Sequence, residues 1–176
     1  MESYKIELEH IKIELLHRRT TNVNVINHLR HFVDQWFCYK YEYITNGNRA
    51  AWGKIIFKEY VSAGVLKLLE KYTEKELLSM KGNNRLIVEK EHIMPLNRIA
   101  KKLLELPKNP SIEEIEIILI ENLKYATITK EEDKLLMKQD MPSEYFDAKH
   151  ELFNDCFARY KTLGIKLIKN NNEFTF

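Results

Sequence analysis

The chain has 176 residues, of which 44% are hydrophobic and 31% are charged, and its formal net charge is only +2. These values are typical of a globular protein with a buried core. They do not indicate the basic domain that many nucleic-acid-binding proteins have, although they allow a local basic patch. No stretch approaches the roughly 18 apolar residues of a membrane-spanning helix, and the amino terminus lacks the apolar core of a signal peptide. We therefore expect a cytoplasmic protein without a membrane partner, with reduced and buried thiols at Cys38 and Cys156.

Residues 1–80 are predicted to form a helical lobe. Apolar residues at steps of four, three and four predict an amphipathic helix over residues 2–18. An aromatic-rich helix is expected over residues 23–43, and a helix that is apolar on several faces is expected over residues 49–72. A capping-box sequence that begins at Thr73 predicts a further short helix.

Residues 81–176 are predicted to form a second region, in which short strands alternate with helices. The helical period is lost over residues 85–93, where strand-type side chains take over. The later predicted elements are a helix over 96–106, a helix from a capping box at Ser111, a strand over 125–128, a helix from a capping box at Thr129, a last helix ending at Leu163 and a final strand over 165–168. The expected fold class is mainly α, with a small β-hairpin and a following helix (a ββα-like element) embedded between helices. The two regions are expected to form one compact unit.

The residues with the most distinctive chemistry lie between Arg85 and Leu136. A predicted strand ends in Glu91-His92, and Asp133 lies in the first turns of the last capped helix of this stretch. Carboxylates, together with waters and a substrate phosphate, can hold a hard divalent cation. A neutral histidine beside the ion can accept a proton from water, and the ion can stabilise the leaving oxygen of a phosphodiester.

Two runs in this stretch resemble the HNH, or His-Me finger, nuclease family, whose metal site is built on a ββα element. The runs are Glu91-His92-Ile93-Met94-Pro95-Leu96 and Asn122-Leu123-Lys124-Tyr125-Ala126-Thr127, and the resemblance covers about residues 85–136. The strands are separated by a longer insertion than the family's compact hairpin has, and the cysteine pairs that bind zinc in many members are missing.

The resemblance implies a role for each matching residue. His92 would be the general base, and Asn122 would brace the loop that carries it. Glu91 and Asp133 would be ligands of Mg²⁺ or Mn²⁺, although the family more often has Asp or His at the first position and His or Asn at the second. Glu132 is better explained by helix capping.

Basic side chains follow the candidate histidine in the predicted helix over 96–106. We expect Arg98, Lys101 and Lys102 to contact the phosphate backbone of a bound nucleic acid. The leading functional expectation is a metal-dependent endonuclease that acts on DNA in preference to RNA, in a restriction or phage-defence setting.

In a second interpretation the chain is not an enzyme. A helix-rich, nearly neutral chain is also typical of a protein–protein interaction module, such as an antitoxin, a phage-encoded inhibitor or a dimeric adaptor. The stretch from Arg85 to Leu136 would then be a degenerate site, and the partner would be another protein or a second copy of the chain.

Overall fold

The computed structural model describes residues 3–21, 26–82, 85–137 and 140–170. The chain forms two compact units, and each unit is built from two separate stretches of sequence. We call them the helical unit (Met1–Lys54 with Pro95–Leu123) and the sheet unit (Ile55–Met94 with Lys124–Phe176). The predicted regions 1–80 and 81–176 therefore both contribute to both units.

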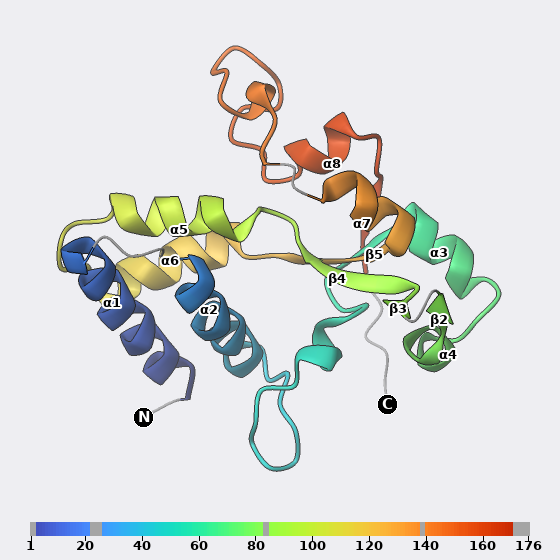
Figure 1. Ribbon diagram of the computed structural model, residues 1–176, viewed down its shortest axis with the longest axis horizontal. Helices are drawn as coiled ribbons and strands as arrows, with labels where there is room; N and C mark the ends of the chain where they lie inside the picture. The colour runs from blue at the N-terminus through green and yellow to red at the C-terminus, as the bar shows by residue number, and fades with distance from the viewer. Residues whose placement is uncertain (1–2, 22–25, 83–84, 138–139, 171–176) are drawn as a thin grey trace. The chain divides into compact units, whose positions relative to one another are not determined.

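The helical unit is a set of four helices packed around an apolar core. Its described helices are α1 (Ser3–Thr21), α2 (Ile26–Lys40), α5 (Leu96–Glu105) and α6 (Ile112–Asn122) (Figure 1). Helix α1 packs along α2, and both α1 and α5 pack against α6. Fully buried side chains such as Ile11, Trp36 and Leu119 fill the centre, so the predicted amphipathic and aromatic-rich helices are confirmed as core-forming elements.

The sheet unit is built around a mixed four-stranded sheet with the strand order β4-β5-β1-β6. The strands are β1 (Tyr60–Ser62), β4 (Val88–His92), β5 (Tyr125–Thr129) and β6 (Leu167–Lys169). Strands β4 and β5 are antiparallel, β5 and β1 are parallel, and β1 and β6 are antiparallel. A separate hairpin pairs β2 (Lys81–Gly82) with β3 (Arg85–Leu86). The described part of the protein is thus mainly α with a small embedded sheet, as predicted.

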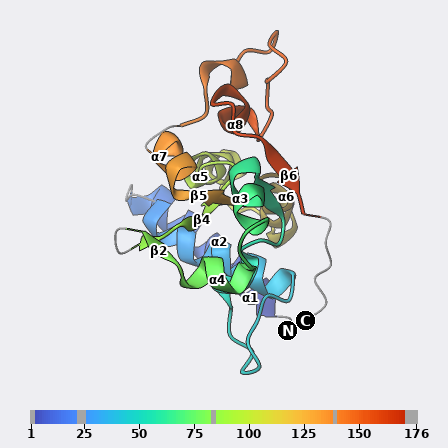
Figure 2. The same ribbon diagram turned by 90° about the vertical axis from the view of Figure 1, so that its right-hand side faces the viewer.

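Short helices cover both faces of this sheet. They are α3 (Ala63–Leu69), α4 (Glu74–Ser79), α7 (Lys130–Leu136) and α8 (Ala158–Thr162), with 3-10 turns η1 (Trp52–Ile55) and η2 (Ser143–Tyr145) in the chain. One face packs in a cluster that includes Ile128, Leu136 and Tyr160, and the other packs in a cluster that includes Val61 and Val88. The chain leaves α8 and turns directly into β6 (Figure 2).

The helix predicted over residues 49–72 was wrong over most of its length. Phe57 adopts a left-handed backbone with a φ of 68°, and Tyr60 and Val61 then pair with β5 as strand β1. Only Ala63–Leu69 is helical in the second half of this range, and its start is fixed by Ser62, whose hydroxyl accepts a hydrogen bond from the Val65 amide. Strand β1 is stabilised by pairing with residues that lie 66 positions away in the sequence. The local period of apolar residues does not reflect that pairing, so it wrongly predicted a helix.

The predicted last helix is also much shorter than expected. Of the stretch up to Leu163, only Ala158–Thr162 forms an α-helix, and Asn154 interrupts the chain before it with a φ of 54°. Gly164 follows the helix with a φ of 68°, in the left-handed conformation that glycine adopts readily at helix ends. Cys38 and Cys156 are both free thiols, of which Cys38 is buried and Cys156 is partly exposed.

Two helix starts share one carboxylate at the end of the parallel strand pair. Glu132 Oε2 accepts hydrogen bonds from the Thr129 amide (2.8 Å) and from the buried Ser62 hydroxyl (2.5 Å). A Cβ atom at Gly64 would lie 2.8 Å from Glu132 Oε1, so a larger residue there would displace this carboxylate from its present position. The interpretation of Glu132 as a capping residue is confirmed, and the same carboxylate also joins α7 to β1.

None of the described helices combines the length and the apolar character needed to cross a lipid bilayer.

Candidate active site

Glu91, His92 and Asp133 lie on a β4–β5–α7 element in the sheet unit. Strand β4 pairs with β5 along its whole length, from Val88 opposite Thr129 to His92 opposite Tyr125. Helix α7 begins directly after β5, because Thr129 is its capping residue, and it packs against both strands (Figure 1). The long insertion between the strands therefore does not prevent them from pairing.

His92 is the last residue of β4, and its imidazole packs against the aromatic ring that lies opposite on β5. The ring centroids of His92 and Tyr125 are 4.8 Å apart, and His92 is only 6% exposed. The Lys90 ammonium, two positions earlier and so on the same face of the strand, lies 4.8 Å from the Tyr125 centroid. His92 is thus held in a packed position by its strand neighbours.

Glu91 faces the opposite side of the sheet from His92, because adjacent residues of a strand alternate between faces. Its Oε1 accepts a hydrogen bond from Nη2 of Arg159 at 2.8 Å, and the same nitrogen donates to the His92 carbonyl at 3.0 Å. Arg159 comes from α8 and is almost completely buried. One guanidinium therefore neutralises Glu91 and fixes the backbone that carries His92.

Asp133 lies on the same side of the sheet as Glu91, but a different cation binds it. The Lys130 ammonium is 3.1 Å from Asp133 Oδ2 and 2.7 Å from Glu89 Oε1. The hydrogen bond with Glu89 is the largest cause that raises the pKa of Lys130. The structure thus joins Asp133 to Glu89, which lies two positions before Glu91 on one face of β4.

The divalent cation that the resemblance implies would need a group of carboxylate or histidine ligands. Among the residues that the structure describes, no three His, Cys, Asp or Glu side chains are grouped so that they could hold a metal ion. Glu91 is bound by Arg159, and Asp133 is bound by Lys130. In these contacts the predicted ligands do not form a metal site, and their assignment as ligands stays a prediction.

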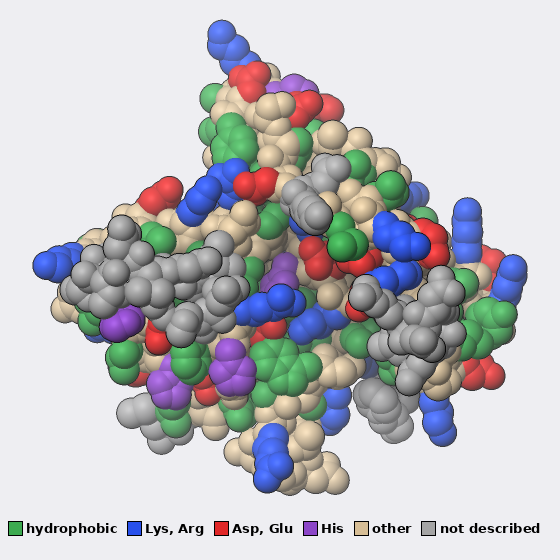
Figure 3. Space-filling view, viewed as in Figure 1, with side chains coloured by type: hydrophobic (Ala, Val, Ile, Leu, Met, Phe, Trp, Pro, Cys, Tyr) green, Lys and Arg blue, Asp and Glu red, His purple; other side chains and the backbone are tan. Residues whose placement is uncertain are grey.

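The other predicted residues belong to the helical unit. Asn122 is buried, and its side-chain amide donates to the Ile118 carbonyl at 2.8 Å in the last turn of α6. Arg98, Lys101 and Lys102 share one face of α5 by their spacing, opposite a buried apolar face, and Lys101 is exposed. Acidic and basic described side chains are intermingled on the face drawn in Figure 3, in keeping with the small net charge.

Three residues near Glu91 were not predicted from the sequence as part of the site. Glu89 carried a usable signal, because it shares a strand face with Glu91 at a spacing of two. Arg159 carried none, since it is 68 positions away in a part of the chain predicted as plain helix. Tyr160 is fully buried on the same face, and burial followed by the charge of Glu91 raises the pKa of its hydroxyl.

A partly buried carboxyl group lies beside β5, the strand that pairs with β4. Oε2 of Glu59 accepts a hydrogen bond from the Tyr125 amide at 2.7 Å. Burial raises the pKa of Glu59 from 4.5 to about 7, against the opposing effects of this hydrogen bond and of Lys124 and Lys169. The folded protein therefore keeps a proton on Glu59 up to near-neutral pH, whereas the unfolded chain loses it near pH 4.5.

We expect Glu59 to weaken the fold as the pH rises from about 4.5 to 8. Between the two pKa values the folded state binds more protons than the unfolded state, so raising the pH favours unfolding. A Glu59→Gln variant keeps an acceptor for the Tyr125 amide and has no charge to bury. It should be more stable than the wild type above pH 7 by up to roughly 3 kcal/mol, and no more stable at pH 4. Urea unfolding of both proteins across this pH range measures the difference, and parallel curves would contradict the assignment.

Comparison of the chain with models of known protein families, with curated protein sequences and with solved structures found no match.

Proposed function

We propose that this chain cleaves phosphodiester bonds in nucleic acid, with His92 as the general base. The observation that supports the proposal is the order and pairing of β4, β5 and α7, with His92 as the last residue of β4. This is the order of elements in the ββα unit of the HNH nucleases that the sequence resembles. A histidine is suited to the step because its usual pKa, about 6.5, lets it accept a proton from water at neutral pH.

Two groups that can bind phosphate lie on the opposite face of β4 from the His92 imidazole. Arg159 and Lys130 present a guanidinium and an ammonium on one side of the sheet, where they now bind Glu91 and Asp133. Both groups bind phosphate oxygens well. Mg²⁺ or Mn²⁺, if bound, would stabilise charge on the leaving oxygen. The predicted ligands Glu91 and Asp133 are bound by these two cations in the structure.

The substrate and setting come from the resemblance alone. We propose DNA in preference to RNA, a site of action in the cytoplasm, and a role in restriction or phage defence. Arg98, Lys101 and Lys102 are proposed to contact the substrate backbone through their shared face of α5.

A second candidate function is a non-enzymatic interaction module. One observation favours it: both carboxylates that the resemblance assigns to a metal are neutralised by protein cations in the structure. In this candidate the β4–β5–α7 element is a scaffold without catalysis, and the partner is a protein or a second copy of the chain.

Cleavage by the wild-type chain separates the two candidates. We expect supercoiled plasmid to be nicked or linearised by the purified protein with Mg²⁺ or Mn²⁺, and to stay intact with EDTA. Single-stranded DNA and RNA of defined sequence serve as further substrates, and products are resolved on gels. Absence of cleavage with every substrate and both ions would reject the nuclease and leave the interaction module.

A further inference from the structure

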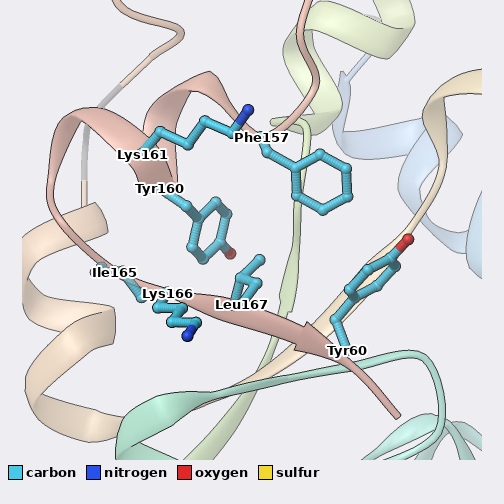
Figure 4. A pocket seen from close by; sticks show the side chains of 7 residues that line it. All are labelled: Tyr60, Phe157, Tyr160, Lys161, Ile165, Lys166 and Leu167. Carbon is cyan, nitrogen blue, oxygen red and sulfur yellow. The ribbon is translucent and has the colours of Figure 1, made fainter. Parts of the chain in front are cut away.

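The sheet unit contains a pocket that none of the predicted site residues lines. It has a volume of about 380 Å³ and lies between β1, β6 and the segment that carries α8. Seven residues line it: Tyr60, Phe157, Tyr160, Lys161, Ile165, Lys166 and Leu167 (Figure 4). This volume is within the range of roughly 300–1,000 Å³ that is usual for small-molecule sites.

Aromatic rings form much of the pocket wall. The rings of Tyr60 and Phe157 have centroids 5.2 Å apart at an angle of 64°, and both side chains are partly exposed. The ring of Tyr160 lies on the other side of Leu167 from Tyr60 (Figure 4). Partly exposed aromatic faces in a concave site favour a flat, unsaturated ligand, because such a ligand can stack on or pack edge-to-face against them.

The pocket also has positive charge at its rim. The Lys161 ammonium binds Asp155 at 2.6 Å, whereas Lys166 is exposed and makes no ion pair with any described residue. Lys169 is opposite Tyr60 in the β1–β6 pair, so it lies on the same face of the sheet as the pocket. A flat ligand that carries an anionic group therefore complements the site better than a neutral one.

The pocket lies on the same face of the sheet as Glu91 and Arg159. Tyr60 is opposite Ala126, and Ala126 is opposite Glu91, so Tyr60 and Glu91 are separated by two interstrand spacings, or about 10 Å. Tyr160 and Arg159 are consecutive residues of α8. The pocket therefore adjoins the part of α8 that carries the buried Arg159.

We infer that this pocket binds an unstacked base of single-stranded nucleic acid, with Lys166 contacting an adjacent phosphate. Aromatic side chains beside lysines are the combination that binds single strands without regard to sequence, since every base has a flat face and a charged backbone beside it. The choice of nucleic acid as the ligand rests on the proposed function. The pocket extends that function by making an unpaired strand the preferred substrate.

Binding without cleavage tests the inference separately from the nuclease proposal. The probe is a fluorescent single-stranded DNA octamer that contains one 5-iododeoxyuridine, titrated in EDTA, with the matching duplex as competitor. We expect the wild type to prefer the single strand, and irradiation to cross-link the iodinated base to a peptide containing Tyr60 or Phe157. Cross-links confined to other peptides would overturn the assignment of the pocket.

Variants supply the second arm of the test. Lys166→Ala should weaken single-strand binding and lower the slope of log affinity against log salt by about 0.7, the effect of one lost phosphate contact on a single strand. Lys149→Ala makes the same change of charge at an exposed lysine outside the pocket and should leave affinity unchanged. Phe157→Leu, checked by thermal melting for folding, should weaken binding about tenfold through lost stacking.

The outcomes distinguish the two proposals. Wild-type affinity and salt slope in both Lys166→Ala and Phe157→Leu would reject the pocket, even if the protein cleaves DNA. Pocket-dependent binding by a wild type that cleaves nothing would reject the nuclease and keep the pocket. Equal affinity for single strand and duplex would reject the preference for an unpaired strand.

Discussion

Replacing His92 with alanine is expected to lower the rate of phosphodiester cleavage by about 10²- to 10⁴-fold. Loss of a general base has this size of effect, because water must then attack without a positioned proton acceptor. The geometry behind the prediction is the place of His92 at the end of β4, with its carbonyl fixed by Arg159 and its ring packed on Tyr125. Initial rates on plasmid at saturating Mg²⁺ measure the effect.

Controls must separate a catalytic from a structural role for His92, since its side chain is buried. His92→Gln fills more of the space and should be as inactive as His92→Ala, while both melt cooperatively. Added imidazole should restore part of the rate in His92→Ala, which a purely structural defect would not allow. Cleavage by His92→Ala at the wild-type rate would remove His92 from the mechanism.

Replacing Arg159 with methionine is expected to destabilise the protein by about 3 kcal/mol. The change leaves Glu91 without its partner on a mostly buried face. Removing one partner of a buried ion pair costs far more free energy of unfolding than removing one partner of an exposed pair. The Glu91 side chain is 28% exposed, so we expect a loss of stability at the lower end of the usual range of about 3–5 kcal/mol. Urea unfolding followed by circular dichroism measures it.

A double variant distinguishes the lost charge pair from lost packing. Glu91→Leu combined with Arg159→Met removes both charges, so it should be clearly more stable than Arg159→Met alone. If the double variant instead loses the sum of the two single effects, the pair is not coupled. Arg159 would then act through packing and through its bond to the His92 carbonyl.

Local sequence signals located most helix starts correctly. The capping boxes at Thr73, Ser111 and Thr129 are all present, each with the reciprocal pair of hydrogen bonds. The reason is physical: both partners of a capping box lie within four residues, so no distant contact is needed to form it. The strand ending at His92 was likewise visible as a loss of helical period before a turn.

Elements that depend on distant strand pairing could not be predicted from local sequence signals. Strand β1 is only three residues long and lies in an apolar stretch that also fits a helix, so nothing local marks Tyr60 and Val61 as the partners of β5. The same limit applies to the candidate site. The position of His92 could be predicted from its own strand, whereas its link to Arg159 depends on how α8 packs on the sheet.

The division of the chain into two interleaved units constrains when the sheet can fold during synthesis. The middle strand β1 leaves the ribosome early, but its neighbours β5 and β6 are synthesised only after the whole of Pro95–Leu123. Until then β1 has no strand to pair with, and the sheet must wait for long-range contacts, which form slowly. A fragment that starts at residue 81 would never complete it, because such a fragment lacks the strand that joins β5 to β6.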